Sequence, residues 1–420
     1  GVTFQAGPMS PQVSAKATRT SSVVGASPSG RVRTASSVVI AGTIAGELDG
    51  VTTRCRAARV ACEDRDPPQE ALTLVSDPVP ETTRDALRTV SIGQPLTSEA
   101  AEVFMAAVLD GEVTPAQLGG MLIGMHARGE TPSELAGFVR ALRSRAHAVA
   151  APAGTIDTCG TGGDVRGTFN ISTASALVVA GAGVPVAKAG NRAVSSQAGS
   201  SDVMRALGLR VEQSAEDAEL SLRRDGFAYL HAPSFHPGMR HAGPVRMELG
   251  VRTAFNMIGP LANPAQPRRQ LVGVPDADAA VSVAAALHEL GTERAFVVHG
   301  ERLDELPLDG TGVILDVSAD GVQRRPVDPA SLGLAPADTD AFKGADGEAN
   351  AGLIVRIFEG SETGPKRDVV ALNAGAALLV AGRADDLREG VELATSTIAS
   401  GAAREQLEHL RASAAAEAAG

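Results

Sequence analysis

Two loops rich in glycine and hydroxyl residues constrain the fold of this chain most. The first runs from Gly160 to Thr173 and the second from Lys188 to Asp202, and each lies between a short apolar run and an apolar helical run. This alternation continues along the chain and predicts an α/β fold with a mainly parallel central sheet and flanking helices. Ligands of such sheets bind at the carboxyl ends of the strands, so we expect both loops at one binding edge.

The first loop has the composition of a phosphate site. Glycines at 160, 162 and 163 let backbone N–H groups approach an anion closely, and the helix expected from Ile171 turns its free N–H groups and positive dipole end toward the loop. Lys188 supplies a cation in the second loop. The spacing is neither a Walker loop nor a dinucleotide fingerprint. A tight turn explains the first loop alone equally well, but the two loops together favour a phosphate-bearing ligand.

Composition limits the partners. With 420 residues the chain is long enough for two domains, and its net charge of −11 argues against binding nucleic acid. No apolar run is long enough to span a bilayer, so we expect no membrane partner. The cysteines (Cys55, Cys62 and Cys159) have neither metal nor disulfide spacing. They are typical of reduced thiols, and we expect a cytoplasmic protein.

Residues 1–80 differ from the rest. They are rich in Ser, Ala, Gly, Val and Arg, and no acidic residue precedes Glu47. We expect a disordered extension outside the fold. An acid-poor, Ser- and Arg-rich start is also typical of an organelle transit segment, which would place the protein in a plastid.

Residues 81–152 are expected to form a small helical bundle. Thr97 is a candidate N-cap, and two capping boxes with Pro at the first helical position follow at Thr114-Pro115-Ala-Gln117 and Thr131-Pro132-Ser-Glu134. The short connections between these helices predict antiparallel packing. Met121 and Met125 fall on an apolar stripe that we expect in the bundle core.

A carboxylate pair follows a later strand. Phe296–His299 is strand-like, and Asp304 and Glu305 come shortly after it. Adjacent carboxylates beside a phosphate site suit Mg²⁺, which binds one or two carboxylates together with substrate phosphate. A solvated acidic turn is the alternative, and the two phosphate-like loops favour the metal site.

Taken in order, the motifs of residues 82–410 resemble those of the anthranilate phosphoribosyltransferases. The matching stretches are Gly160-Thr-Gly-Gly-Asp164, Asn170-Ile-Ser-Thr173, Lys188-Ala-Gly-Asn-Arg192, Ser195-Ser196, Gly199-Ser200, Phe235-His236-Pro237, Arg246 before Leu249-Gly250, Phe255-Asn256, Gly259-Pro260-Leu261, and His299-Gly300 leading to Asp304-Glu305. This resemblance implies transfer of a 5-phosphoribosyl group from phosphoribosyl pyrophosphate to the amine of anthranilate, in tryptophan biosynthesis. It also implies a homodimer.

The resemblance implies a domain division as well. A small helical domain would comprise residues 81–152 and a segment near 240–262. A larger α/β domain would comprise residues 153–239 and 263–415, with the active site in the hinge cleft between the two.

By the same resemblance, Lys188 and Arg246 are the catalytic residues. Residues implied to bind phosphoribosyl pyrophosphate are Gly160, Gly163, Asp164, Thr168, Asn170, Ile171, Ser172, Thr173, Lys188, Ala189, Gly190, Asn191, Arg192, Ala193, Val194, Ser195, Ser196 and Ser200. Anthranilate would contact Gly160, Asn191 and Arg246. Two Mg²⁺ ions would be held by Ser172, Asp304 and Glu305. Arg246 would pair the substrate carboxylate, a task suited to a planar bidentate donor.

One position departs from the family pattern. The family usually has His after the lysine of the second loop, where this chain has Ala189. The resemblance places this histidine on the side of the aromatic acceptor. Two interpretations of His231 are open: it partly takes over this role, or it is a partly buried polar residue near a strand end. Two alternatives follow: a pyrimidine-nucleoside phosphorylase-like enzyme, or a paralogue with a different aromatic acceptor. The retained acidic pair and the Asn170–Thr173 motif argue against the first.

Overall fold

The structure is a computed structural model that describes residues 81–162, 167–192, 198–301 and 303–419. The expectations for residues 1–80, Gly163, Asp164, Ala193, Val194, Ser195 and Ser196 therefore lie outside the described residues. None of the helices in the described ranges is long and apolar enough to cross a membrane.

The described chain begins with four helices: α1 (Glu81–Ser91), α2 (Ser98–Asp110), α3 (Pro115–Arg128) and α4 (Pro132–Ser144). The side chain of Thr97 accepts a hydrogen bond at the start of α2, and both expected capping boxes are formed, at Thr114 and Thr131. Met121 and Met125 are fully buried, which confirms that the methionine stripe faces the core. Local sequence signals therefore set the starts of α2, α3 and α4.

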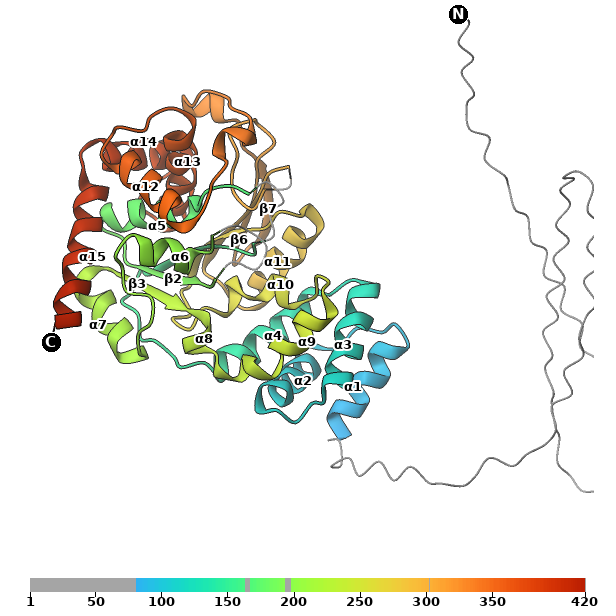
Figure 1. The fold of residues 1–420 in the computed structure, drawn as a ribbon. Coiled ribbons are helices and arrows are strands. Elements are labelled where there is room, and N and C mark those ends of the chain that lie inside the picture. The colour runs from blue at the N-terminus through green and yellow to red at the C-terminus, as the bar shows by residue number, and fades with distance from the viewer. Residues whose placement is uncertain (1–80, 163–166, 193–197, 302, 420) are drawn as a thin grey trace, which may run out of the picture. The chain divides into compact units, whose positions relative to one another are not determined.

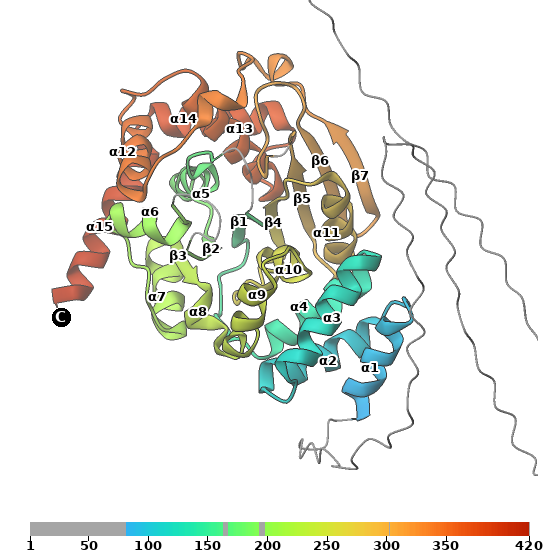
Figure 2. The ribbon, with the colours of Figure 1, turned by 45° about the vertical axis from the view of Figure 1, so that its right-hand side comes forward.

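A seven-stranded sheet forms the centre of the larger part, with its strands labelled in Figure 2. Its strands are β1 (Ile156–Gly160), β2 (Val186–Gly190), β3 (Phe227–His231), β4 (Arg269–Gly273), β5 (Arg294–His299), β6 (Val313–Ser318) and β7 (Gly321–Pro326), in the order β3-β2-β1-β4-β5-β6-β7. The five strands from β3 to β5 are parallel, and β6 and β7 continue the sheet antiparallel. The expected fold class is confirmed. All parallel strands end at one edge, which carries the motif loops.

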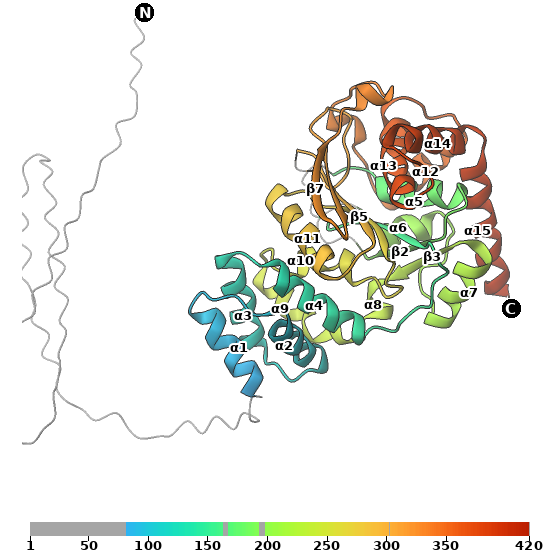
Figure 3. The ribbon, with the colours of Figure 1, turned by 180° about the vertical axis from the view of Figure 1, so that it is seen from behind.

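Helices cover both faces of the sheet (Figures 1 and 3). The remaining helices are α5 (Ile171–Gly181), α6 (Ser200–Ala206), α7 (Ala215–Asp225), α8 (Ala232–Phe235), η1 (Pro237–His241), α9 (Gly243–Leu249), α10 (Phe255–Ile258), η2 (Pro260–Ala262), α11 (Ala277–Glu289), η3 (Pro329–Leu332), η4 (Thr339–Phe342), α12 (Gly347–Phe358), α13 (Pro365–Val380), α14 (Leu387–Ala399) and α15 (Ala402–Ala419). Alternate strand residues enter different hydrophobic clusters: Leu271 of β4 packs with α5 and α13, whereas its neighbour Val272 packs with α11.

The four N-terminal helices share a hydrophobic cluster with one face of the sheet. Leu122 and Phe138 of the bundle belong to the same buried cluster as Leu287 of α11 and Val297 of β5. The segment from η1 to η2 joins this packing, because η1 contacts α2, α9 contacts α3, and α10 and η2 contact α4. The bundle is thus bound to the sheet layer by continuous apolar contact.

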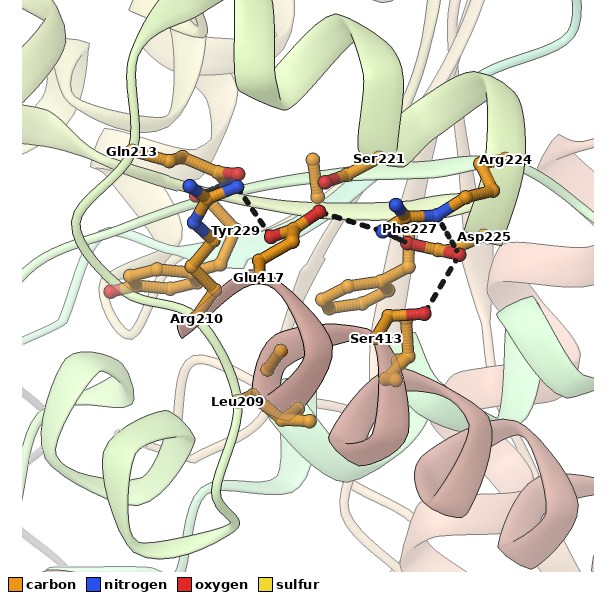
Figure 4. Close-up of a pocket in the computed structure, with 13 residues that line it drawn as sticks. Leu209, Arg210, Gln213, Ser221, Arg224, Asp225, Phe227, Tyr229, Ser413 and Glu417 are labelled. Atoms are coloured by element: carbon orange, nitrogen blue, oxygen red, sulfur yellow. Dashed lines mark hydrogen bonds and ion pairs between the residues drawn. The ribbon is translucent and has the colours of Figure 1, made fainter. Parts of the chain in front are cut away.

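A pocket lies between α7, β3 and α15 (Figure 4). Its polar groups pair with one another: Glu417 bridges Arg210 and Arg224, and the carboxylate of Asp225 accepts hydrogen bonds from Arg224 and Ser413. These contacts fasten the last helix to the edge of the sheet. The phosphate-like loops lie elsewhere, at the carboxyl ends of the parallel strands.

Candidate active site

The first loop meets the acidic pair directly. β1 and β4 are neighbours with Gly160 opposite Gly273, and Asp304 lies against both: a β-carbon at 273 would come within 1.7 Å of the Asp304 carbonyl oxygen, and one at 160 within 2.4 Å of its Oδ2. The N–H of Gly162 donates to Asp304 Oδ2 at 3.0 Å. Glycine at both strand ends therefore makes room for the acidic segment.

Glu305 closes onto the start of α5. Its Oε1 accepts the N–H of Ser172 at 3.0 Å, so a carboxylate lies at the positive end of this helix. Asn170 precedes the first helical turn, and Ser172 is partly exposed there. Two other motif residues, Ile171 and Thr173, are buried.

Lys188 is nearly completely buried at the centre of this arrangement. Its Nζ donates to the carbonyl oxygen of Thr158 at 2.6 Å and to Ser172 Oγ at 3.5 Å. The fully buried carboxylate of Asp157 lies near it. Burial raises the pKa of Asp157, and the charge of Lys188 opposes that rise. The ammonium is therefore held at a defined point between the two loops.

The described ends of the second loop are tied together. Asn191 is exposed, its carbonyl oxygen accepts from Ser200 Oγ at 3.3 Å, and its Oδ1 accepts the N–H of Arg192 at 2.8 Å. Asn170 of the first loop donates to the carbonyl oxygen of Ala198 at 3.3 Å. The two loops therefore touch. The backbone of Thr168 pairs with that of Lys343 in a single antiparallel β-bridge outside the sheet.

Arg246 lies on α9, in the segment that packs against the bundle. Its guanidinium sits 5.0 Å from the centre of the Phe255 ring, and burial lowers its pKa. The side chain is half-buried and has no hydrogen bond or ion pair with another described residue. A cation that is partly desolvated and stacked on an aromatic ring suits a planar carboxylate ligand.

Ala189 and His231 lie on adjacent strands. Gly190, next to Ala189, pairs with His231 at the ends of β2 and β3. His231 is buried, its ring stacks with that of Tyr229, and its Nε2 has no hydrogen-bond partner among the described residues. Burial lowers its pKa. His231 therefore lies buried at the end of β3, as in the structural interpretation given in the sequence analysis.

Three asparagines that support the site were missed at the sequence level. Asn263 donates to Asp157 Oδ2 and to the carbonyl oxygen of Ala187, each at 2.8 Å. Asn350 donates to Asn170 Oδ1 at 3.0 Å. The third is Asn373 of α13. Each asparagine hydrogen-bonds to a residue distant in sequence. Only Asn373 had a sequence signal, because it is a single asparagine within an apolar helical run.

Asn373 holds the acidic segment in place. It is fully buried on α13, accepts the N–H of Leu306 at 2.9 Å and donates to the carbonyl oxygen of Leu306 at 3.0 Å. Leu306 directly follows Glu305. This two-way contact fixes the backbone that carries both carboxylates.

The donor set suits a hard cation. Asp304, Glu305 and Ser172 offer only oxygen atoms, and their contacts bring all three to the phosphate-like loops. Within the described ranges, no group of three or more His, Cys, Asp or Glu residues could hold a metal. A cation here would take further oxygen ligands from water or from a bound phosphate.

Family models match both parts of the chain. A helical bundle domain of a glycosyl transferase family matches residues 84–146, and the a/b domain of a glycosyl transferase family matches residues 153–404. With the loops and acidic pair at the strand ends, these matches define a two-domain glycosyl transferase.

Individual relatives narrow the class. The anthranilate phosphoribosyltransferase of Desulforudis audaxviator is 48% identical over 329 residues, covering 78% of this chain and 95% of the relative. That of Herpetosiphon aurantiacus is 44% identical, covering 78% and 97%. The crystal structure of the Thermus thermophilus enzyme is 43% identical with a TM-score of 0.74, covering 78% of this chain and 98% of that chain. The chain belongs to the anthranilate phosphoribosyltransferase family.

A more distant solved structure has the same fold. The anthranilate phosphoribosyltransferase of Saccharomyces cerevisiae, in complex with PRPP (phosphoribosyl pyrophosphate) and Mg, is 23% identical with a TM-score of 0.72. The match covers 80% of this chain and 98% of the yeast chain.

Proposed function

We propose that this protein transfers the 5-phosphoribosyl group of phosphoribosyl pyrophosphate to the amine of anthranilate in tryptophan biosynthesis. The products are N-(5-phosphoribosyl)anthranilate and pyrophosphate. One observation carries the proposal: Asp304 and Glu305 accept N–H groups from Gly162 and Ser172 of the first loop, and Lys188 of the second loop donates to Ser172. These contacts bring the glycine loop, a cation and oxygen donors together at one site.

The mechanism follows from charge. The bond from ribose C1 to the pyrophosphate oxygen breaks, a bond from C1 to the anthranilate nitrogen forms, and the nitrogen loses a proton. Lys188 and the positive end of the α5 dipole stabilise the charge that grows on the leaving group. Mg²⁺, when bound, neutralises further charge on that group. Positioning does the rest, and no side chain acts as a nucleophile.

Arg246 is proposed to bind the acceptor. Its half-buried guanidinium would pair with the anthranilate carboxylate while Phe255 supports its other face. Gly160 and Asn191, at the ends of β1 and β2, would complete the acceptor contacts. The other residues implied by the resemblance, including those outside the described ranges, are proposed to hold phosphoribosyl pyrophosphate.

Finer features of the family belong to the same proposal. Two Mg²⁺ ions would share Ser172, Asp304 and Glu305, and the yeast relative solved in complex with PRPP and Mg supports use of magnesium. We include a homodimer, a cytoplasmic location, and the division into a helical domain (81–152 with 240–262) and an α/β domain (153–239 with 263–415).

The direct test is turnover. The purified protein should consume anthranilate, followed by loss of its fluorescence, only when phosphoribosyl pyrophosphate and Mg²⁺ or Mn²⁺ are present. No turnover by folded protein with either metal would reject the function. Activity that survives the double substitution Asp304→Ala and Glu305→Ala would reject the metal site.

Acceptor identity needs a second assay, because Ala189 departs from the family pattern. Among a panel of aromatic amines, anthranilate should have the highest kcat/KM. The substitution Ala189→His should alter the KM for the amine rather than the KM for phosphoribosyl pyrophosphate. If an amine without the carboxylate had the highest kcat/KM, the result would instead support a paralogue with a different aromatic acceptor.

A further inference from the structure

Tyr229 connects the interior of the sheet to the second loop. It lies on β3, is 1% exposed, and its hydroxyl oxygen is 2.9 Å from Ser200 Oγ. In Figure 4 its hydroxyl points away from the ionic network around Glu417. Gln213 donates to its backbone carbonyl at 2.7 Å. Both the strand and the side chain of Tyr229 are therefore held in place.

Counting protons gives a direction to these contacts. Either hydroxyl can donate in the contact between Tyr229 and Ser200; when Ser200 Oγ gives its single hydrogen to the carbonyl oxygen of Asn191 at 3.3 Å, it accepts the hydrogen of Tyr229. Burial raises the pKa of Tyr229 to about 12, so the phenol keeps this hydrogen at neutral pH. A relay thus runs from Tyr229 through Ser200 to Asn191.

The backbone of the loop is packed against this relay. A β-carbon at Gly190 would come within 2.3 Å of Ser200 Oγ and 2.5 Å of the Tyr229 oxygen. The N–H of Ser201 also donates to the Asn191 carbonyl, at 3.4 Å. A shift of the phenol would therefore move residues 190, 191 and 200 together.

We infer that Tyr229 is a positioning residue for phosphoribosyl pyrophosphate, acting through Ser200 and Asn191. The inference rests on the proposed function, which places both residues at the substrate. The phenol does not touch the reacting atoms. It sets the geometry of the loop before the substrate arrives, so its loss should weaken substrate binding more than it slows the chemical step.

The composition of the chain makes Tyr229 directly observable. The protein has one Tyr and no Trp, so its intrinsic tyrosine emission comes from this residue alone. Phenol emission responds to hydrogen bonding and to nearby charge. A polyanion that binds at Ser200 and Asn191 should therefore change the emission of the unmodified protein.

The experiment uses Tyr229→Phe, which keeps the ring and removes the hydroxyl. We expect the KM for phosphoribosyl pyrophosphate to rise about 3- to 10-fold, as for loss of one hydrogen bond, with kcat and the KM for anthranilate nearly unchanged. In the wild type, phosphoribosyl pyrophosphate without acceptor should change the emission along a saturating curve. Ser200→Ala should raise the same KM, and adding Tyr229→Phe to it should raise the KM little further.

Phe227→Leu is the matched control, because Phe227 lies on the same strand and in the same hydrophobic cluster but away from the loop. It should lower the thermal midpoint and leave the KM unchanged. An unchanged KM in Tyr229→Phe, or an unchanged emission at saturating substrate in a wild type that turns over, would overturn the inference alone. A folded wild type that consumes no phosphoribosyl pyrophosphate would overturn the proposed function as well.

Discussion

At the scale of single residues, the site combines groups whose charges are held by burial. Lys188 is nearly buried between the loops, and Arg246 is stacked on Phe255. Burial strengthens each electrostatic contact and lowers the reorganisation needed when a ligand binds. Substitutions that conserve charge but alter shape therefore test the site most sharply.

Replacement of Arg246 should affect the acceptor alone. Arg246→Ala should lower kcat/KM for anthranilate about 10- to 100-fold, equivalent to about 1.4–2.8 kcal/mol, because a bidentate partner of the carboxylate is lost. Arg246→Lys should recover little, since an ammonium cannot form the paired contact. Steady-state kinetics with both substrates would check this, and an equal loss of affinity for phosphoribosyl pyrophosphate would contradict it.

Replacement of Asn373 should affect the metal. Asn373→Leu removes both contacts to the Leu306 backbone, and we expect the concentration of Mn²⁺ that half-saturates the protein, in the presence of pyrophosphate, to rise about tenfold. Electron paramagnetic resonance of free Mn²⁺ measures this without turnover.

Leu378→Ala, at a buried position of the same helix, controls for lost stability. It should leave Mn²⁺ affinity unchanged. If both variants bound Mn²⁺ as the wild type does, Asn373 would have a structural role only.

At the scale of elements, the sequence predicted what depends on neighbours along the chain. The capping boxes at Thr114 and Thr131 set the starts of α3 and α4, and glycine-rich loops follow β1 and β2 as expected. It did not predict which distant asparagines support the site. Asn263 reaches Asp157 across 106 positions and Asn373 reaches Leu306 across 67, and one sequence contains no local pattern that pairs them.

Within the bundle, Glu134 of α4 contacts α3, the N-cap of its own helix and the segment that precedes α2. It is fully buried and accepts hydrogen bonds from Arg128, from the N–H of Leu96, and from Thr131. Glu134→Ala should therefore reduce the free energy of unfolding by about 3–5 kcal/mol, because Arg128, two backbone N–H groups and the Thr131 hydroxyl lose their acceptor. Chemical denaturation would measure the loss.

Glu99 is a matched control in the first turn of α2, where its side chain is exposed. Glu99→Ala should leave the free energy of unfolding nearly unchanged. Similar losses in the two variants would show that the buried network of Glu134 adds little.

At the scale of the whole molecule, one sheet organises the described chain. Five parallel strands bring the loops after β1, β2 and β5 to one end of the sheet, while α15 is fastened beside the edge strand β3. The parallel part and its binding edge followed from sequence periodicity. The antiparallel addition of β6 and β7 did not, because strand direction at a sheet edge depends on long-range pairing.

The anchor of α15 should weaken in acid. Burial alone would raise the pKa of the Asp225 carboxyl, but hydrogen bonds from Arg224 and Ser413 and the nearby positive charges outweigh it, and the pKa is lowered. A lowered folded-state pKa stabilises the protein above the unfolded-state value and loses this effect as pH falls through the folded-state value. The gap in thermal midpoint between wild type and Asp225→Asn should therefore be largest near neutral pH and shrink below about pH 4. A gap that is constant with pH would contradict this.

The apolar cluster that runs from the bundle into the α11 face also limits the construction of chimeras between relatives. Exchange of residues 81–146 alone would set a foreign bundle against the native α11, α10 and η2, with which α4 packs. A workable exchange would carry residues 237–262 and the facing positions of α11 along with the bundle. Recombination within this family should therefore succeed at boundaries drawn by contact in space: residues 237–262 add two crossovers to an exchange of the bundle, and the facing positions of α11 are exchanged as point substitutions.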